Sequence, residues 1–245
     1  MIFSEGLHLK GLTLGAFFAL LSAGLVPVSA EPRPENCVDI YKHGRILNQS
    51  LEMRLEEKVH QLRIPKDYSN WSTSRREGDV FPNKLILMNY ETFEPFARFS
   101  WQQKGDPVQL TNISVMIDDE IPLDQLLLIN LSYRFWLRDD AFSFLEIVPS
   151  DFGLSEVLVD ERVRSRAILY DGIFIDGNRF DDIDTVIMCD GSESRNRSGR
   201  CKHYFRSHGI DVGLGYDRRN FEIWKKIQEN IDYFVGCIAV PGIEQ

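Results

Sequence analysis

The chain has 245 residues, of which 43% are apolar, and a formal net charge of -9 at pH 7. This length and apolar content are enough to build a hydrophobic core, which excludes a disordered chain. The excess of acids argues against a nucleic-acid-binding protein, because nucleic acid attracts basic surfaces, and it is compatible with a basic partner.

Residues 1–30 have the form of a cleavable secretory signal. The stretch from Leu12 to Val28 contains no charged side chain, and the small residues Val28-Ser29-Ala30 that follow suit a signal peptidase. An uncleaved anchor helix is the alternative, which Pro27 and the small-residue ending argue against. We therefore expect a periplasmic or secreted mature chain that has no membrane span after cleavage.

The first part of the mature chain is expected to be rich in strands. Residues 31–55 are expected to form a lead-in segment, loosely structured at its start and tethered by Cys37. Apolar residues that alternate or run together then predict strands, with the polar, turn-rich segment 67–82 between the first two. These strands are expected at 56–64, 84–90, 109–117 and 126–137.

The second part repeats this pattern and ends in a helix. Strands are expected at 167–175, 183–189, 201–205 and 210–216, with a turn at 176–178. From Phe221 onward the apolar residues recur at spacings of three and four, which predicts an amphipathic helix with Asn220 as its N-cap and Gly236 as its end.

The whole pattern predicts an α+β protein, mostly antiparallel β-sheet, with a C-terminal amphipathic helix packed on one face. We expect residues 56–245 to form this α+β domain, either as one unit or as two β-rich halves at 56–150 and 151–245.

Four cysteines remain after export, and an even number in an exported chain is typical of disulfides. Cys189 and Cys201 bracket a polar loop between two predicted strands, so a bridge across this hairpin is the economical pairing. That pairing leaves Cys37 to bond Cys237 near the other end of the mature chain. Zinc binding is the alternative, but the chain has no CxxC pair and no histidine at ligand spacing from these cysteines.

Two segments resemble a known group of proteins. Residues 62–68 (LRIPKDY), followed by the strand at 84–90, resemble the opening of small exported proteins found beside type VI secretion effectors. The cysteine hairpin at 189–201, the strand after it and the helix at 218–235 are similar to the end of the same proteins. The resemblance covers about a third of the chain. It implies a periplasmic immunity protein, which binds and occludes a toxic effector and has no catalysis of its own.

The acidic residues are the most suggestive chemical groups. They form one cluster at Asp118, Asp119 and Glu120, and a second at Asp176, Asp181, Asp182 and Asp184. The second cluster lies in a glycine-containing turn, as calcium ligands do, but it lacks the spacing of an EF-hand, which favours a solvated acidic turn. We therefore expect no cofactor, with calcium as a minor alternative, and assign both clusters to the binding of a protein partner.

Catalysis finds less support in the sequence. The chain contains neither G-x-S-x-G nor HExxH, and its histidines are scattered. An exported hydrolase with an unfamiliar acidic site and a calcium-binding envelope protein remain alternatives to the non-catalytic binding protein that we favour. Five Asn-x-Ser tripeptides, at Asn48, Asn70, Asn112, Asn130 and Asn196, are interpreted as coincidence rather than glycan acceptors.

Overall fold

A computed structural model describes residues 36–69, 76–96, 110–119, 122–131, 140–162, 170–190 and 199–240 of the chain. The expected signal at 1–30, Glu120, the tripeptides at Asn70 and Asn196 and most of the polar loop between Cys189 and Cys201 lie outside these residues. Within them, no helix is long and apolar enough to cross a membrane.

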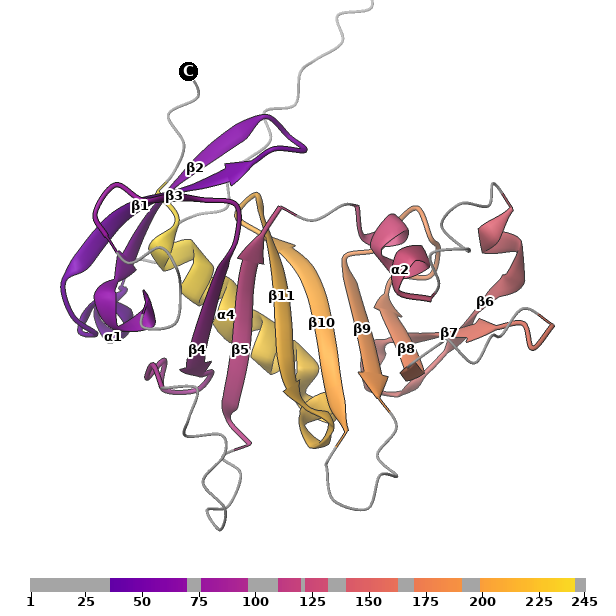
Figure 1. Cartoon of the computed structure of the whole chain (residues 1–245). Helices are drawn as coiled ribbons and strands as arrows, with labels where there is room; N and C mark the ends of the chain where they lie inside the picture. Colours follow the sequence, from indigo (N-terminus) through magenta and orange to yellow (C-terminus); the bar gives the residue numbers. More distant parts are fainter. Residues whose placement is uncertain are drawn as a thin grey trace, which may run out of the picture.

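An antiparallel sheet of eight strands forms the body of the molecule (Figure 1). The strand order is β4-β5-β11-β10-β9-β8-β7-β6, so strands from the first and second parts of the mature chain lie in one sheet. The strands are β4 (Lys84–Asn89), β5 (Asn112–Asp118), β6 (Leu145–Pro149), β7 (Ser155–Val159), β8 (Tyr170–Asp176), β9 (Thr185–Asp190), β10 (Arg200–Ser207) and β11 (Ile210–Asp217). The five strands expected around 84–90, 109–117, 183–189, 201–205 and 210–216 are confirmed, as is the described part of the strand at 167–175.

A second sheet of three strands stands beside the first, in the order β2-β1-β3. It contains β1 (Ile46–Met53), β2 (Lys58–Pro65) and β3 (Val80–Phe81), and the short helices α1 (Val38–Tyr41) and η1 (Lys66–Ser69) flank it. The strand expected at 56–64 is confirmed as β2. The lead-in segment expected at 31–55 includes strand β1, which pairs with β2 along its whole length and has alternate residues buried.

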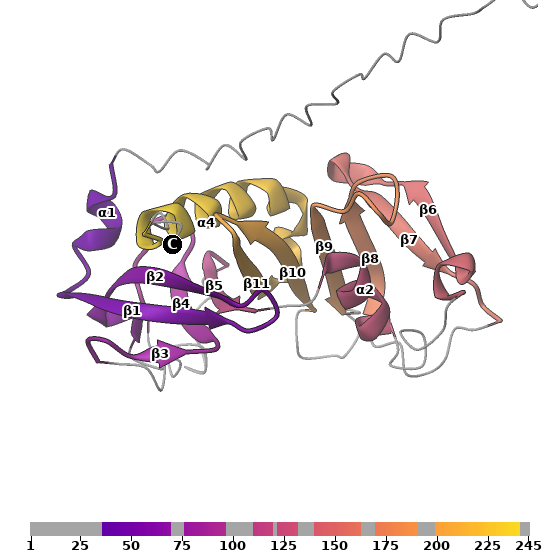
Figure 2. The ribbon, with the colours of Figure 1, turned by 90° about the horizontal axis from the view of Figure 1, so that it is seen from above.

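Helix α4 (Trp224–Ile238) covers one face of the large sheet and confirms the C-terminal amphipathic helix. Its apolar residues are buried against alternate residues of β5, β10 and β11 and against residues of the small sheet, in one core. Figure 2 shows the helix along this face. Burial of each such side chain contributes about 1.5 to 3 kcal/mol.

Both expected ends of this helix are wrong. A 3-10 helix, η5 (Arg218–Ile223), precedes α4 and contains Asn220, whose amide donates to the carbonyl of Leu110 instead of capping α4. Gly236 lies inside the helix, because the buried Cys237 and Ile238 continue the packed face for another two residues. The helix therefore ends where its buried face ends.

Helix α2 (Leu123–Leu131) covers the opposite face of the sheet, over β8 and β9 (Figure 2). The strand expected at 126–137 is wrong for the described residues. Pro122 accepts the first helical hydrogen bond from the Leu126 amide, and leucine favours a helix as readily as a buried strand. Leu127 and Leu131 pack with Val186 and Met188 of β9, which belong to the second core. Two further 3-10 helices, η3 (Ala141–Phe144) and η4 (Asp151–Gly153), flank β6.

A buried polar pair links the two sheets. The side chain of Lys84, at the start of β4, is fully buried, and its Nζ donates to Oε1 of Gln49 on β1 at 2.7 Å. The Gln49 amide in turn donates to the carbonyl of Arg76 at 3.0 Å. Burial lowers the pKa of Lys84 to about 8. The small sheet is thus held by specific polar contacts as well as by the shared core.

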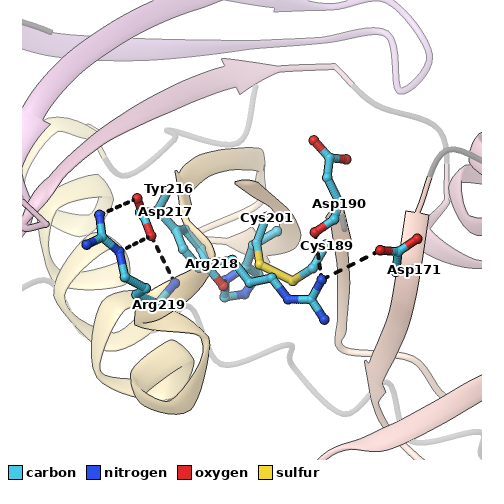
Figure 3. The surroundings of a disulfide bond; sticks show 9 residues. Asp171, Cys189, Asp190, Cys201, Tyr216, Asp217, Arg218 and Arg219 are labelled. Atoms are coloured by element: carbon cyan, nitrogen blue, oxygen red, sulfur yellow. Dashed lines mark hydrogen bonds and ion pairs between the residues drawn. A yellow bond between two sulfur atoms is a disulfide. The ribbon is translucent and has the colours of Figure 1, made fainter. Parts of the chain in front are cut away.

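Both expected disulfide pairs are present. Cys37 and Cys237 join α1 to the end of α4, with 5.7 Å between their Cα atoms. Cys189 and Cys201 lie directly opposite each other on β9 and β10 (Figure 3). The guanidinium of Arg218 donates to the carbonyl of Asp190 at 2.7 Å and lies 4.0 Å from the carboxylate of Asp171, so it joins η5 to this end of the sheet.

Removal of the long-range disulfide should be the more damaging change. In the chain-entropy model, a bridge across 200 residues of sequence contributes about 5 kcal/mol and one across 12 residues about 3 kcal/mol. We expect the Cys37→Ser/Cys237→Ser variant to lose more unfolding free energy than the matched Cys189→Ser/Cys201→Ser variant in urea titrations. Equal losses, or a larger loss in the second variant, would contradict this expectation.

Candidate functional site

A cleft of about 1010 Å³ opens at one end of the large sheet. Five separate parts of the chain line it: the β1–β2 hairpin, the start of α2, the β8–β9 connection, the β10–β11 hairpin and the middle of α4. The antiparallel order brings the end of β8, the start of β9 and the β10–β11 turn to this same end, at the top of the sheet in Figure 1.

The cleft is strongly acidic. Its described lining contains eight carboxylates and one lysine or arginine side chain, that of Arg206. The carboxylates belong to Glu56, Asp124, Asp176, Asp181, Asp184, Asp211, Glu229 and Asp232. Apolar side chains lie among them, chiefly Leu55, Leu123, Leu126, Phe180 and Ile183. A site of this composition favours a cationic ligand that also has apolar surface.

Arg206 is held by the cleft's own acids. Its guanidinium forms an ion pair with Glu56 of the β1–β2 hairpin, lies 3.9 Å from Asp211 and donates to the carbonyl of Gly209 at 3.0 Å. Burial alone would raise the pKa of Glu56, but hydrogen bonds from Lys58 and Arg206 lower it overall. Glu56 is therefore charged at neutral pH and fixes its hairpin to β10.

The turn between β8 and β9 places three of the expected acids in the cleft. Asp176, Asp181 and Asp184 line it, whereas Asp182 is not among its lining residues. Gly177 has a φ of +143°, and a Cβ atom there would lie 2.2 Å from the carbonyl oxygen of Asp182, so only glycine fits this turn. The Asp184 amide donates to the carbonyl of Asp176 at 3.1 Å and closes the turn.

The other expected acidic cluster lies beside the cleft. Asp118, the last residue of β5, is paired in register with Asp211 of β11, which lines the cleft. Asp119 accepts a hydrogen bond from the amide of Leu55 at 2.8 Å and so caps the β1–β2 hairpin. Burial raises the pKa of Asp118, and the neighbouring charge of Asp119 adds to this effect. The fold thus brings the described parts of both clusters to one end of the sheet.

The buried side chain of His203 contacts Gln228, a residue of the cleft lining. His203 of β10 is fully buried, and its Nε2 lies 2.8 Å from Oε1 of Gln228, a cleft residue of α4. The same Gln228 oxygen accepts from the hydroxyl of Thr185 at 2.9 Å, so His203 donates to it as a neutral ring. Burial lowers the pKa of His203 to about 4. These contacts fix the middle of α4 on the sheet.

The polar groups of the cleft do not form an activated nucleophile among the described residues. The hydroxyl of Ser207 donates to Asp232 at 2.6 Å, and the ring of His208 lies 4.0 Å from the same carboxylate. The serine thus donates to an acid rather than to a histidine base. No group of three or more His, Cys, Asp or Glu side chains in the described parts of the chain is arranged to hold a metal ion.

Several cleft residues carry no local sequence signal. Glu56, Asp124 and Asp211 lie far apart in the sequence, within or beside expected strands, and only the fold brings them to one cleft. Glu229 and Asp232, three residues apart on the polar side of α4, form an acidic stripe that the helical spacing reveals. The sequence analysis does not predict Leu123 and Asp124 as site residues, because they precede the strand expected at 126–137 and in fact begin helix α2.

Two of the described Asn-x-Ser asparagines donate side-chain hydrogen bonds within the chain, although Asn48 is exposed. The amide of Asn130 donates to the carbonyl of Leu126 within α2, and that of Asn48 donates to Glu77 at 2.6 Å. Asn112 is half-buried at the start of β5.

Solved structures of two other proteins resemble this one. The immunity protein Smlt3025 of the Stenotrophomonas maltophilia type IV secretion system is 17% identical, and the match covers 78% of this chain and 92% of Smlt3025 with a TM-score of 0.55. The chain shares the fold of this immunity protein. The iron-regulated outer membrane lipoprotein FrpD of Neisseria meningitidis is 10% identical over 82% of this chain and 96% of FrpD, with a TM-score of 0.42. No protein-family model and no curated protein matches the chain.

The neutral state of His203 makes stability depend on pH. Because the folded pKa of about 4 lies below the unfolded value of 6.5, the unfolded chain binds an extra proton between these values, and folding is disfavoured as the pH falls. We expect the free energy of unfolding to fall between pH 7 and pH 4, and about 3 kcal/mol of this decrease to come from His203. Urea titrations of wild type and His203→Gln should show a shallower pH dependence in the variant; identical slopes would contradict the assignment.

Proposed function

We propose that this protein is an exported immunity protein, which neutralises a secreted antibacterial effector by binding it and has no catalytic activity of its own. The observation that carries the proposal is the acidic cleft, where five separate segments present eight carboxylates and apolar side chains at one end of the sheet. A large concave surface with a strong excess of negative charge suits a macromolecular partner of opposite charge.

The shared fold supports the same role. Smlt3025, which has this fold, is an immunity protein of a type IV secretion system, whereas the sequence resemblance is to proteins found beside type VI effectors. An exported immunity protein would meet an effector that acts in the periplasm. The two disulfides suit that oxidising compartment, as does the signal expected at residues 1–30.

Neutralisation is tested by co-expression with the secreted product of a neighbouring gene. When that effector is directed to the periplasm, we expect the full chain to restore growth and to form a stable complex on size-exclusion chromatography. A matched chain lacking residues 1–30 should stay in the cytoplasm and give no protection. Continued killing in the presence of the full chain, together with no complex, would refute the proposal.

The charge of the cleft also predicts how fast the complex forms. Opposite charges steer encounter, and salt screens them over a Debye length of about 10 Å at 0.1 M ionic strength. We expect the association rate, measured by stopped flow, to fall about tenfold or more between 0.05 and 0.5 M NaCl, with a much smaller change in the dissociation rate. An association rate that does not respond to salt would remove the electrostatic part of the proposal.

A further inference from the structure

We propose that the cleft holds one cationic segment of the partner, in which an arginine side chain lies next to an aliphatic or aromatic one. This inference rests on the proposed function and deepens it, because it specifies the chemistry of the bound segment. Three features of the cleft support it: its uncompensated carboxylates, its apolar walls and its size.

The first feature is charge without internal compensation. Asp124, Asp176, Asp184 and Glu229 come from three parts of the chain and face one cleft, and within the described residues their side chains form no ion pair or hydrogen bond. The cation among them, Arg206, is already bound to Glu56 and lies near Asp211. A bound cation would therefore relieve repulsion between these acids without breaking an existing ion pair.

The second feature is the apolar surface beside those acids. Leu123, Phe180 and Ile183 pack on the core beneath α2 and are only partly buried, so their remaining surface faces the cleft. The ring of Phe180 packs against that of Phe142, with 4.8 Å between the ring centroids. An apolar surface next to carboxylates fits a segment that carries both cationic and apolar side chains.

The third feature is size. At about 1010 Å³ the cleft lies at the upper end of the range for small-molecule sites, and it accommodates several side chains at once. The described acids are not arranged as a metal site. Arginine matches the cleft better than lysine, because its planar guanidinium can donate two parallel hydrogen bonds to one carboxylate and can stack on an aromatic ring such as that of Phe180.

The test uses synthetic peptides and the full chain purified from the periplasm of an expression host. One peptide alternates arginine with leucine and phenylalanine, a second replaces arginine with glutamate, and a third replaces leucine and phenylalanine with serine. We expect the first peptide alone to bind well, and to shift the amide NMR signals of residues 122–126, 176–184 and 228–232.

Two variants with the same change of net charge separate the cleft from general electrostatics. Asp176→Asn/Asp184→Asn removes two cleft carboxylates and should weaken binding of the first peptide about tenfold or more. Glu146→Gln/Glu222→Gln removes two exposed carboxylates outside the cleft and should change binding by less than about twofold.

The proposal is overturned if the first peptide does not bind the wild type, or if both double variants bind it equally. It is also overturned if the serine peptide binds as well as the first, or if the shifted NMR signals lie outside residues 122–126, 176–184 and 228–232. The co-expression test distinguishes a failure of the cleft assignment from a failure of the proposed immunity function. If Asp176→Asn/Asp184→Asn protects cells fully, the cleft assignment fails while the immunity function stands. If the wild type gives no protection and forms no complex, the immunity function itself fails.

Discussion

The alternation of side chains along β10 and β11 is the constraint on which the rest of the molecule depends. His203, Phe205, Val212 and Leu214 point into the core under α4, so Tyr204, Arg206 and Asp211 must point to the opposite face. A shift of register by one residue would bury Arg206 and Asp211 and expose the core residues. The same packing that stabilises the fold therefore sets the side chains of the cleft.

Contacts with the rest of the protein hold two of the elements that line the cleft. The α4 helix is tied to the sheet by His203 and Gln228, and to α1 by the Cys37–Cys237 disulfide. The β1–β2 hairpin is fixed by Asp119 and by the ion pair between Glu56 and Arg206. A binding surface built on elements held in this way loses little entropy when a partner binds.

The sequence predicts the elements whose pattern is local. The helix α4 follows from apolar spacings of three and four, and the disulfides follow from an even number of cysteines around a polar loop. The strand expected at 126–137 is wrong because a run of leucines suits either a buried strand or a helix. The packing of α2 on β8 and β9, which is a tertiary contact, favours the helix. Strand β1 is missed because its pairing with β2 and β3 decides its structure.

The cleft is predictable only in part, because tertiary contacts rather than local patterns bring most of its residues together. Asp176, Asp181 and Asp184 stand out because they are dense in sequence, whereas Glu56, Asp124 and Asp211 become neighbours of these acids only through the sheet order. The proposed binding site is formed by the convergence of five segments, which no single sequence motif shows.

Hydrogen–deuterium exchange on the protein alone and in complex with the effector that we propose as its partner tests the role of the cleft most directly. If the cleft holds the partner, the complex should slow exchange in residues 122–126, 176–184 and 228–232, which come from three separate elements. Residues 145–159 of β6 and β7, at the far edge of the sheet, should exchange unchanged. Protection of 145–159 with no change in the three cleft segments would contradict the assignment of the cleft.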